Sequence, residues 1–171
     1  LPNSFSVLAA AEQNNLFFAP DTYMEKIAVG SNLPKNIVDL DYSIEKNIKN
    51  LADAKNTSPE NLTVCLLDRP RHNEFIKKLK SMKVKLKLIS DGDISGVIYV
   101  INEKSPVDMY VGIGGGPEGV LAAAALSCYN GQIQTRLVLN NEEQIRAKKM
   151  GINDFKRKYN IEDMIKDDVM F

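Results

Sequence analysis

The chain of 171 residues is long enough to bury a substantial core, as one domain or as one domain and part of a second. Its 22 basic and 22 acidic side chains balance, so no overall field favours nucleic acid or an acidic membrane surface, and we expect neither as a partner. No apolar run approaches the roughly 20 residues of a membrane-spanning helix, and nothing at the amino end is typical of a signal peptide.

Two cysteines are too few for a disulfide scaffold. Cys65 lies within the apolar run LTVCLL and Cys128 lies on an expected helix, so we predict two free, buried thiols. A catalytic cysteine would need the single histidine, His72, beside it, and nothing in the sequence places it there. We therefore expect a reducing, cytoplasmic setting.

Residues 1–40 contain three short apolar runs, SFSVLAAAE, LFFAP and MEKIAVG. They predict short strands joined by turns, in the manner of hairpins. We expect residues 1–40 to form part of the sheet of a first domain.

Residues 41–140 follow a different pattern, in which strands and helices alternate. The helical spacing of Ile44, Ile48 and Leu51 predicts a helix that Ser43 caps. The later runs are LTVCLLD (buried strand), HNEFIKKLKSM (helix), VKLKLIS (half-exposed strand near a sheet edge), ISGVIYVI (helix), VDMYVGIG (strand), PEGVLAAAALSCY (helix) and QIQTRLVL (strand). This order predicts an α/β domain with a central, mostly parallel sheet and helices on both faces.

Residues 141–171 are expected to return toward the first domain. NNEEQIRAKKMG and INDFKRKYNIEDMIK predict two surface helices, and DVMF predicts a last strand. The central sheet would then be flanked by strands of a second sheet. Because the chain opens at Leu1 and closes on an apolar strand, we expect it to be a piece of a larger protein.

The segment VGIGGGPEGVLAAAAL connects an apolar strand to a helix through closely spaced glycines. Gly114, Gly116 and Gly119 match the G-x-G-x-x-G pattern of a dinucleotide-binding Rossmann domain, for which Glu142 or Glu143 would hold the ribose of NAD. Glu118 lies in the first turn of the helix, where a pyrophosphate would meet a like charge. A divalent cation between carboxylate and phosphate would remove that repulsion.

The carboxyl ends of three parallel strands should meet at one edge of the sheet, where ligands of such folds bind. The first strand is followed by Arg69 and Arg71, the second by Asp91 and Asp93, and the third by Glu118. Each group also has a purely structural interpretation: solvated arginines, aspartates that cap a helix, and a glutamate that stabilises a helix dipole. Together they favour a site for phosphate and a metal ion.

These motifs resemble a known family. LFFAPDTYMEKIAVG, LLDRPRH, ISDGD and GIGGGPEGVLAAAAL are similar, in order and spacing, to segments of class II fructose-1,6-bisphosphatases, including the bifunctional fructose/sedoheptulose bisphosphatases of cyanobacteria. The resemblance covers the whole chain and implies part of the lithium-sensitive sugar phosphatase superfold. It also implies hydrolysis of the 1-phosphate of fructose 1,6-bisphosphate with Mg²⁺ or Mn²⁺, as in gluconeogenesis, with residues 41–140 as the substrate-binding domain.

The resemblance implies roles for individual positions. Glu118 would be a metal ligand. The substrate-binding positions would be Tyr23, Arg69, Pro70, Arg71, Asp91, Gly92, Asp93 and Gly115. The other metal carboxylates of the family, and the D-P-x-E-G-T segment with its catalytic threonine, lie upstream of the region that begins at Leu1. We therefore expect no catalytic residue among these 171 residues and no phosphatase activity from them alone.

The full-length protein should form a homo-oligomer that binds a phosphorylated sugar. The remaining alternatives are the NAD-binding domain and a non-catalytic domain for anion binding or assembly.

Overall fold

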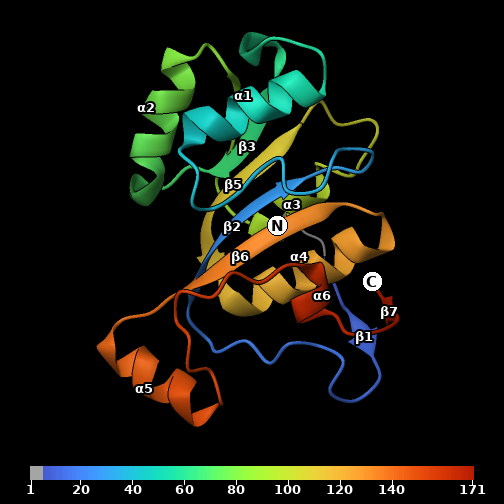
Figure 1. Ribbon diagram of the computed structural model, residues 1–171, viewed down its shortest axis with the longest axis vertical. Helices are drawn as coiled ribbons and strands as arrows, with labels where there is room; N and C mark the ends of the chain where they lie inside the picture. Colours follow the sequence, from blue (N-terminus) through green and yellow to red (C-terminus); the bar gives the residue numbers. More distant parts are fainter. Residues whose placement is uncertain (1–5) are drawn as a thin grey trace.

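The computed structural model describes residues 6–171, and its centre is a five-stranded sheet with the order β4-β3-β5-β2-β6 (Figure 1). The strands are β2 (Tyr23–Val29), β3 (Thr63–Leu67), β4 (Lys85–Ile89), β5 (Met109–Gly115) and β6 (Gln132–Val138). Strand β2 is antiparallel to β5 and β6, whereas β3 is parallel to β4 and β5. The expected α/β architecture with a mostly parallel central sheet is confirmed, and the half-exposed β4 does lie at an edge.

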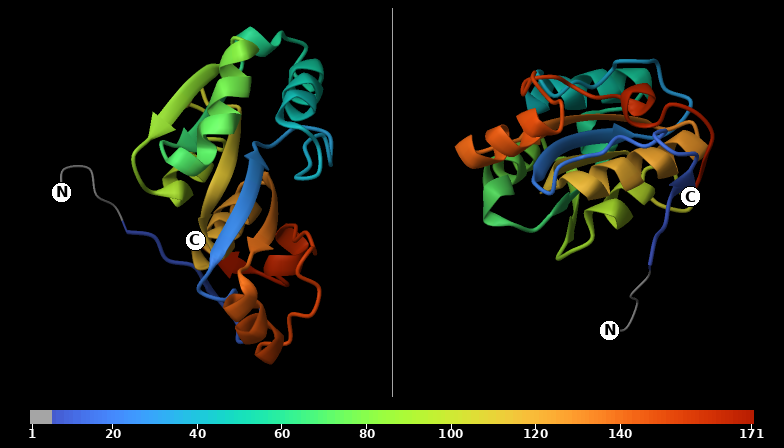
Figure 2. Two further views of the ribbon diagram at one scale, coloured as in Figure 1. Left: turned by 90° about the vertical axis from the view of Figure 1, so that its left-hand side faces the viewer. Right: turned by 90° about the horizontal axis from the view of Figure 1, so that it is seen from below.

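Helices cover both faces of this sheet, as predicted. In Figure 2 the sheet lies between α1 (Ile44–Ala54) on one side and α4 (Gly116–Cys128) on the other. Each face of the sheet has its own apolar core. Helix α2 (Asn73–Ser81) packs in the core on the α1 side, called the α1 core, and α3 (Asp93–Ile98) packs in the core on the α4 side, called the α4 core. Single turns of 3-10 helix at Pro59–Asn61 and Pro70–His72 complete the connections.

The order of the sheet differs from expectation at β2. MEKIAVG was predicted to belong to a separate sheet of residues 1–40, but β2 lies inside the central sheet, with Tyr23 opposite Gly115 of β5 and Val138 of β6. Its side chains alternate between the two apolar cores, so Met24 and Ala28 face α4 while Ile27 and Val29 face α1. A strand buried on both faces is stable in the middle of a sheet and would be costly at its rim.

A second, two-stranded sheet does join the flanks of the chain. Strand β1 (Ala10–Ala11) pairs antiparallel with β7 (Val169–Met170), close together in Figure 1. The SFSVLAAAE prediction begins at Ser4, outside the described residues, and of its described part, residues 6–12, only Ala10–Ala11 is a strand. LFFAP contributes a single bridge, from Leu16 to Ile165.

The carboxyl flank contains one of the two expected surface helices in full. Helix α5 (Asn141–Lys149) begins at a capping box of Asn140 and Glu143. The second prediction is wrong except for the single turn α6 (Ile161–Met164). Tyr159 pairs with Thr135 on the outer side of β6, which requires extended backbone where the pattern predicted a helix.

The two cysteines differ from each other. Cys65 is buried in β3, and burial raises the pKa of its thiol to about 12, as expected of an inert core residue. Cys128 is exposed, contrary to the prediction, because it is the last residue of α4. Among residues 6–171, the longest apolar helix falls short of what crossing a bilayer requires.

Candidate functional site

Arg71 and Tyr23 lie together where β3 and β5 end and β2 begins. The Arg71 guanidinium carbon is 5.1 Å from the centre of the Tyr23 ring, and Nε and Nη2 donate to the Ile113 carbonyl at 3.0 and 2.8 Å. Both side chains are exposed, so the remaining donors of Arg71 and the phenol of Tyr23 face solvent. A guanidinium held this way is suited to bind an oxyanion.

The predicted acidic positions separate into an exposed and a buried one. Asp91 is exposed, and its carboxylate lies 3.9 Å from Arg69, a separation at which a surface pair contributes little. Asp93 begins α3 and is buried, after Gly92 has turned the chain at a φ of 80° that favours glycine. The structural interpretation of Asp93 as a helix cap is wrong, since no side chain caps α3 and Asp93 faces β2 instead.

Lys26 of β2 is the partner of Asp93, and the sequence analysis missed it. Its ammonium group donates to Oδ2 of Asp93 and to the carbonyl of Gly115, the latter at 2.7 Å. Burial lowers the pKa of Lys26, while Asp93 and, more weakly, Glu118 oppose this shift. The only available signal was a lysine at a position of β2 where the alternation of the strand demands an apolar side chain.

The glycines of the β5–α4 segment provide the space for these groups. A Cβ on Gly114 would lie 2.1 Å from Oδ2 of Asp93, and one on Gly119 would lie 3.1 Å from Cε of Lys26. A Cβ on Gly115 would lie 2.0 Å from a carboxylate oxygen of Glu118. The protein's own side chains therefore fill the space that a Rossmann loop would leave for a pyrophosphate.

His72 is buried at the same edge and connects the end of β3 to β5. Its Nδ1 lies 2.8 Å from the Leu67 carbonyl, and its Nε2 accepts from the Ile113 N–H at 2.8 Å, so the proton is on Nδ1. Burial lowers the pKa of His72, and the charges of Arg71 and Arg69 lower it further. As predicted, His72 lies at a helix start, and it is fully engaged with the backbone.

Glu118 lies in the first turn of α4, directly over Gly115. The carbonyl of the same Gly115 accepts from Lys26, which also pairs with Asp93, so Glu118 and Asp93 lie on either side of the end of β5. Across residues 6–171, no three histidine, cysteine or acidic side chains lie close enough to hold a metal ion together. Glu118 therefore offers one ligand, and a metal here would need others from substrate or from elsewhere.

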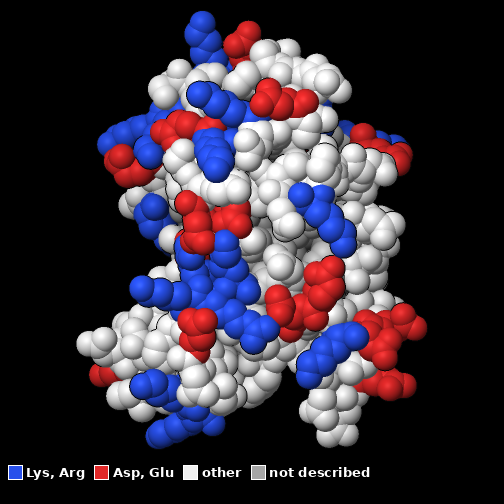
Figure 3. Space-filling model, viewed as in Figure 1, with Lys and Arg blue, Asp and Glu red and all other residues white. Residues whose placement is uncertain are grey.

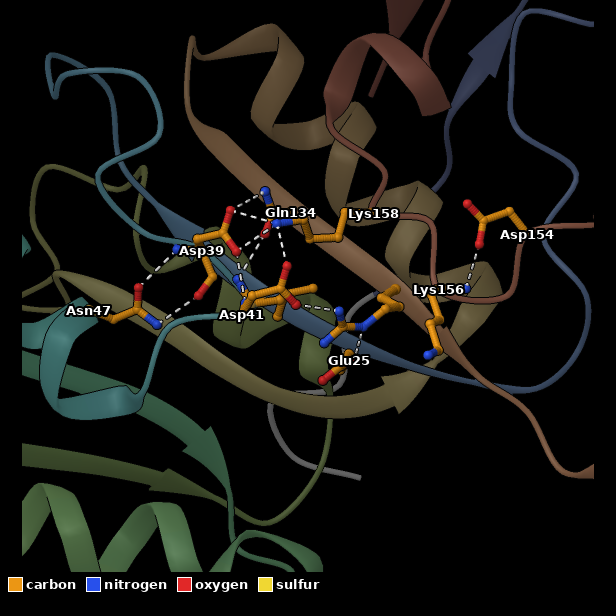
Figure 4. Close-up of polar contacts among 10 residues, drawn as sticks. Glu25, Asp39, Asp41, Asn47, Gln134, Asp154, Lys156 and Lys158 are labelled. Carbon is orange, nitrogen blue, oxygen red and sulfur yellow. Dashed lines mark hydrogen bonds and ion pairs between the residues drawn. The ribbon is translucent and has the colours of Figure 1, made fainter.

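A second polar cluster, which was not foreseen, lies on the other face of the sheet, where Glu25 of β2 contributes to it. Lys158 contacts both oxygens of Asp39 at 2.7 and 2.8 Å and also Asp41, and Arg136 pairs with Asp41 and Glu25 (Figure 4). Figure 3 accordingly shows blue and red side chains side by side over the middle of this face. These groups satisfy one another, so we assign the cluster to fixing the segment after β2 against β6.

A cavity of about 670 Å³ lies away from the carboxyl ends of β3, β4 and β5. It is next to the start of β6, and its lining includes Gln132, Asn160 and Lys166 but none of the predicted site residues. Volume alone does not identify a binding site. The charged residues Arg71, Asp93 and Glu118 lie instead at the carboxyl ends of the strands.

Comparison with known proteins agrees with the motifs. The family model described as bacterial fructose-1,6-bisphosphatase, glpX-encoded, matches residues 1–171. The chain belongs to this family. Members of the family named class 2 fructose-1,6-bisphosphatase are phosphoric monoester hydrolases, and the predicted family resemblance is confirmed.

Two similar members illustrate the extent of the match. The chain is 40% identical to the class 2 fructose-1,6-bisphosphatase of Haemophilus influenzae, over 97% of the chain and 54% of that protein. It is 42% identical to the class 2 fructose 1,6-bisphosphatase/sedoheptulose 1,7-bisphosphatase of Synechocystis sp., over 81% of the chain and 40% of that protein. The chain thus spans about half the length of the curated fructose-1,6-bisphosphatases that it matches.

The structure also tests the alternative of a NAD-binding Rossmann domain. Glu143, a candidate to hold the ribose of NAD, uses its carboxylate to accept from the Asn140 N–H at 2.7 Å. Gly114 and Gly115 belong to β5 and Gly116 already begins α4, so no phosphate-binding loop separates strand from helix. The geometry does not support a NAD site.

Proposed function

We propose that the edge formed by the ends of β3, β4 and β5 is the substrate-binding part of a class II fructose-1,6-bisphosphatase. Arg69 and Arg71, on either side of Pro70, would hold a phosphate of the substrate together with Tyr23. The segment Asp91–Asp93 would accept hydrogen bonds from sugar hydroxyls, and the Gly115 backbone would lie against the sugar phosphate.

One observation carries this proposal. Three segments that are distant in the sequence meet at the end of β5: Arg71 donates to the Ile113 carbonyl, Lys26 joins Asp93 to the Gly115 carbonyl, and Glu118 lies over Gly115. A surface that brings a guanidinium, a buried carboxylate and a helix N-terminus together matches an anionic, hydroxyl-bearing ligand better than a nucleobase or a peptide.

Glu118 would hold Mg²⁺ or Mn²⁺ between the first turn of α4 and a phosphate of the substrate. When bound, such an ion polarises the phosphoryl group and positions the attacking water. This chain's residues would orient the sugar and fix its phosphate, and the carboxylate of Glu118 would supply one of the metal's oxygen ligands.

The reaction we assign to the whole protein is hydrolysis of fructose 1,6-bisphosphate to fructose 6-phosphate and phosphate, in gluconeogenesis. We expect a cytoplasmic homo-oligomer. Residues 41–140 together with β2 would form the substrate-binding domain, and the flanks that β1 and β7 join would belong to the first domain. The 171 residues alone should release no phosphate, because no three histidine, cysteine or acidic side chains of residues 6–171 lie close enough to hold the metal ions that the reaction needs.

Calorimetry tests the substrate. Fructose 1,6-bisphosphate with Mn²⁺ should bind the chain, and NAD under the same conditions should give no heat beyond dilution. Binding of NAD without binding of the sugar bisphosphate would reverse the assignment.

A turnover assay tests whether the 171 residues bind substrate but need the upstream segment for catalysis. Metal-dependent phosphate release from the 171 residues alone would contradict the expected inactivity. Adding the segment of a relative that carries D-P-x-E-G-T should restore turnover, whereas a domain for assembly or anion binding would stay inactive in the mixture.

A further inference from the structure

Lys26 is unusual among the residues of the central sheet because it carries a charge into an apolar core. The side chain of Lys26 is fully buried, and Asp93 is 7% exposed. On the same face of β2, the preceding and following side chains are Met24 and Ala28, both in the α4 core. A buried ion pair is often no more stabilising than apolar side chains of the same size, so stability alone does not explain the presence of Lys26 and Asp93 here.

The surroundings of Lys26 are shaped to admit it. A Cβ on Gly114 would lie 3.1 Å from Nζ of Lys26, and a Cβ on Gly119 would lie 3.1 Å from its Cε and 2.4 Å from Sδ of Met24. Two glycines of the β5–α4 segment therefore make room for the stem and head of one lysine. Gly114 and Gly119, which form a G-x-x-x-x-G pattern, therefore leave space for the Lys26 side chain.

The two acceptors of Lys26 are both predicted to touch substrate. One is the carboxylate of Asp93, which Lys26 binds through Oδ2, and the other is the carbonyl of Gly115 at 2.7 Å. Gly115 is the residue before α4 and precedes the turn that carries Glu118. One ammonium group thus joins β2 to the start of α3 and to the start of α4.

We propose that Lys26 is a positioning residue of the sugar-binding site, a role that rests on the function proposed above. It holds Oδ2 of Asp93 so that the second carboxylate oxygen faces the sugar hydroxyls in one orientation, and it fixes the Gly115 carbonyl so that α4 begins at the correct distance. The ligand class that depends on it is a sugar phosphate, not free phosphate, because phosphate itself is held by the arginines.

The test follows binding to the 171-residue chain by ¹⁵N NMR in metal-free buffer. The probes are fructose 6-phosphate and inorganic phosphate, and the variants are Lys26→Met and Lys55→Met. Lys55 is the control because it also pairs with an aspartate, Asp108, whose Oδ2 accepts from the Thr63 N–H at the start of β3, away from the proposed site.

Lys26→Met should weaken fructose 6-phosphate binding by about tenfold or more, the usual effect of losing hydrogen bonds to a charged group. Its affinity for inorganic phosphate should stay unchanged, and Lys55→Met should change neither affinity. A general loss of structure would lower both affinities, so the split between the two probes is the decisive readout. Equal fructose 6-phosphate affinity in Lys26→Met and the unchanged chain would overturn the inference.

The unchanged chain provides a second measurement that requires no variant to fold. The ammonium signal of the buried Lys26 should shift when fructose 6-phosphate is added and stay in place when phosphate is added. An unmoved signal at saturating fructose 6-phosphate contradicts the role of Lys26 alone. If the unchanged chain shows no response to fructose 6-phosphate anywhere, the proposed function fails, and the role of Lys26 fails with it.

Discussion

Arg71 and Ile113 are joined by two hydrogen bonds, in which Nε and Nη2 of the guanidinium donate to one carbonyl oxygen at 3.0 and 2.8 Å. The adjacent His72 accepts from the N–H of the same Ile113. Strand β3 ends at Leu67, so its edge no longer pairs with β5 at this level. The side chains of Arg71 and His72 thus make the hydrogen bonds to Ile113 that a longer β3 would make. These bonds hold Arg71 at the edge of the sheet and, among residues 6–171, leave its Nη1 free to bind a ligand.

Arg71→Met should weaken inorganic phosphate binding by about ten- to a hundredfold, because a charged bidentate donor is lost. Arg71→Lys should recover only part of the affinity, since an ammonium group keeps the charge but not the fork. Calorimetry with phosphate measures both. Arg146→Met on the exposed surface of α5 is the control, and a similar loss there would show that only overall charge matters.

Stability should fall as the pH is lowered from 7.5 toward 5.5. Burial and the neighbouring arginines hold the pKa of folded His72 below the ordinary value of about 6.5. At a pH between the pKa of His72 in the folded chain and its higher pKa in the unfolded chain, the unfolded chain binds a proton that the folded chain does not. The free energy of unfolding therefore declines as the pH falls, by at most about 1.4 kcal/mol per pH unit.

Urea unfolding at several pH values measures this slope. His72 is the only histidine, so the ring-proton NMR signal reports its pKa directly, and His72→Gln should flatten the stability profile over this pH range. A folded pKa at or above 6.5 would contradict the hydrogen-bonding scheme.

Gly114→Ala should lower the free energy of unfolding by about 1–3 kcal/mol, the range for overpacking a core. Its new methyl group would lie 2.1 Å from Asp93, a contact that the buried carboxylate cannot relieve without leaving Lys26. Gly112→Ala is the comparison, since its methyl group would approach His72 and Tyr110 only to 3.3 Å. Equal losses in thermal unfolding would refute the fit between Gly114 and Asp93.

Glu118→Gln should weaken Mn²⁺ binding in the presence of fructose 1,6-bisphosphate by about tenfold or more. The amide keeps the shape of the side chain but removes the charge that attracts a hard cation. Water-proton relaxation by bound Mn²⁺ measures the change. Glu142→Gln, on the exposed start of α5, should behave as the unchanged chain, and a Glu118→Gln variant that also does so would remove Glu118 from the site.

The regular elements of residues 41–140 could be predicted because each has its own period or cap. The alternation in VKLKLIS placed β4 at the edge, and Ser43 accepts from the Lys46 N–H as an N-cap should. The position of β2 could not be predicted, because strand order depends on which surfaces meet, and nothing local in MEKIAVG specifies its neighbours. The helix expected over 152–166 failed for the same reason, since pairing with β6 outweighed local propensity.

The meeting of the candidate site residues at one edge could be predicted for those that follow strand ends, but not for a residue in the interior of a strand. Arg71, Asp93 and Glu118 follow parallel strands, so topology alone brought them to one edge. Lys26 lies in the middle of β2 and reaches this edge only because β2 is antiparallel and adjacent to β5. Its partner, Asp93, is 67 residues away in the sequence, a contact that no local pattern announces.

The most direct test of the whole account is a crystal structure of the chain with fructose 6-phosphate. We predict the phosphate within about 3 Å of Arg71 donors, and a sugar hydroxyl at the same distance from the Asp93 carboxylate. Density for the sugar phosphate in the cavity beside Gln132 and Asn160, with none next to Arg71, would contradict it.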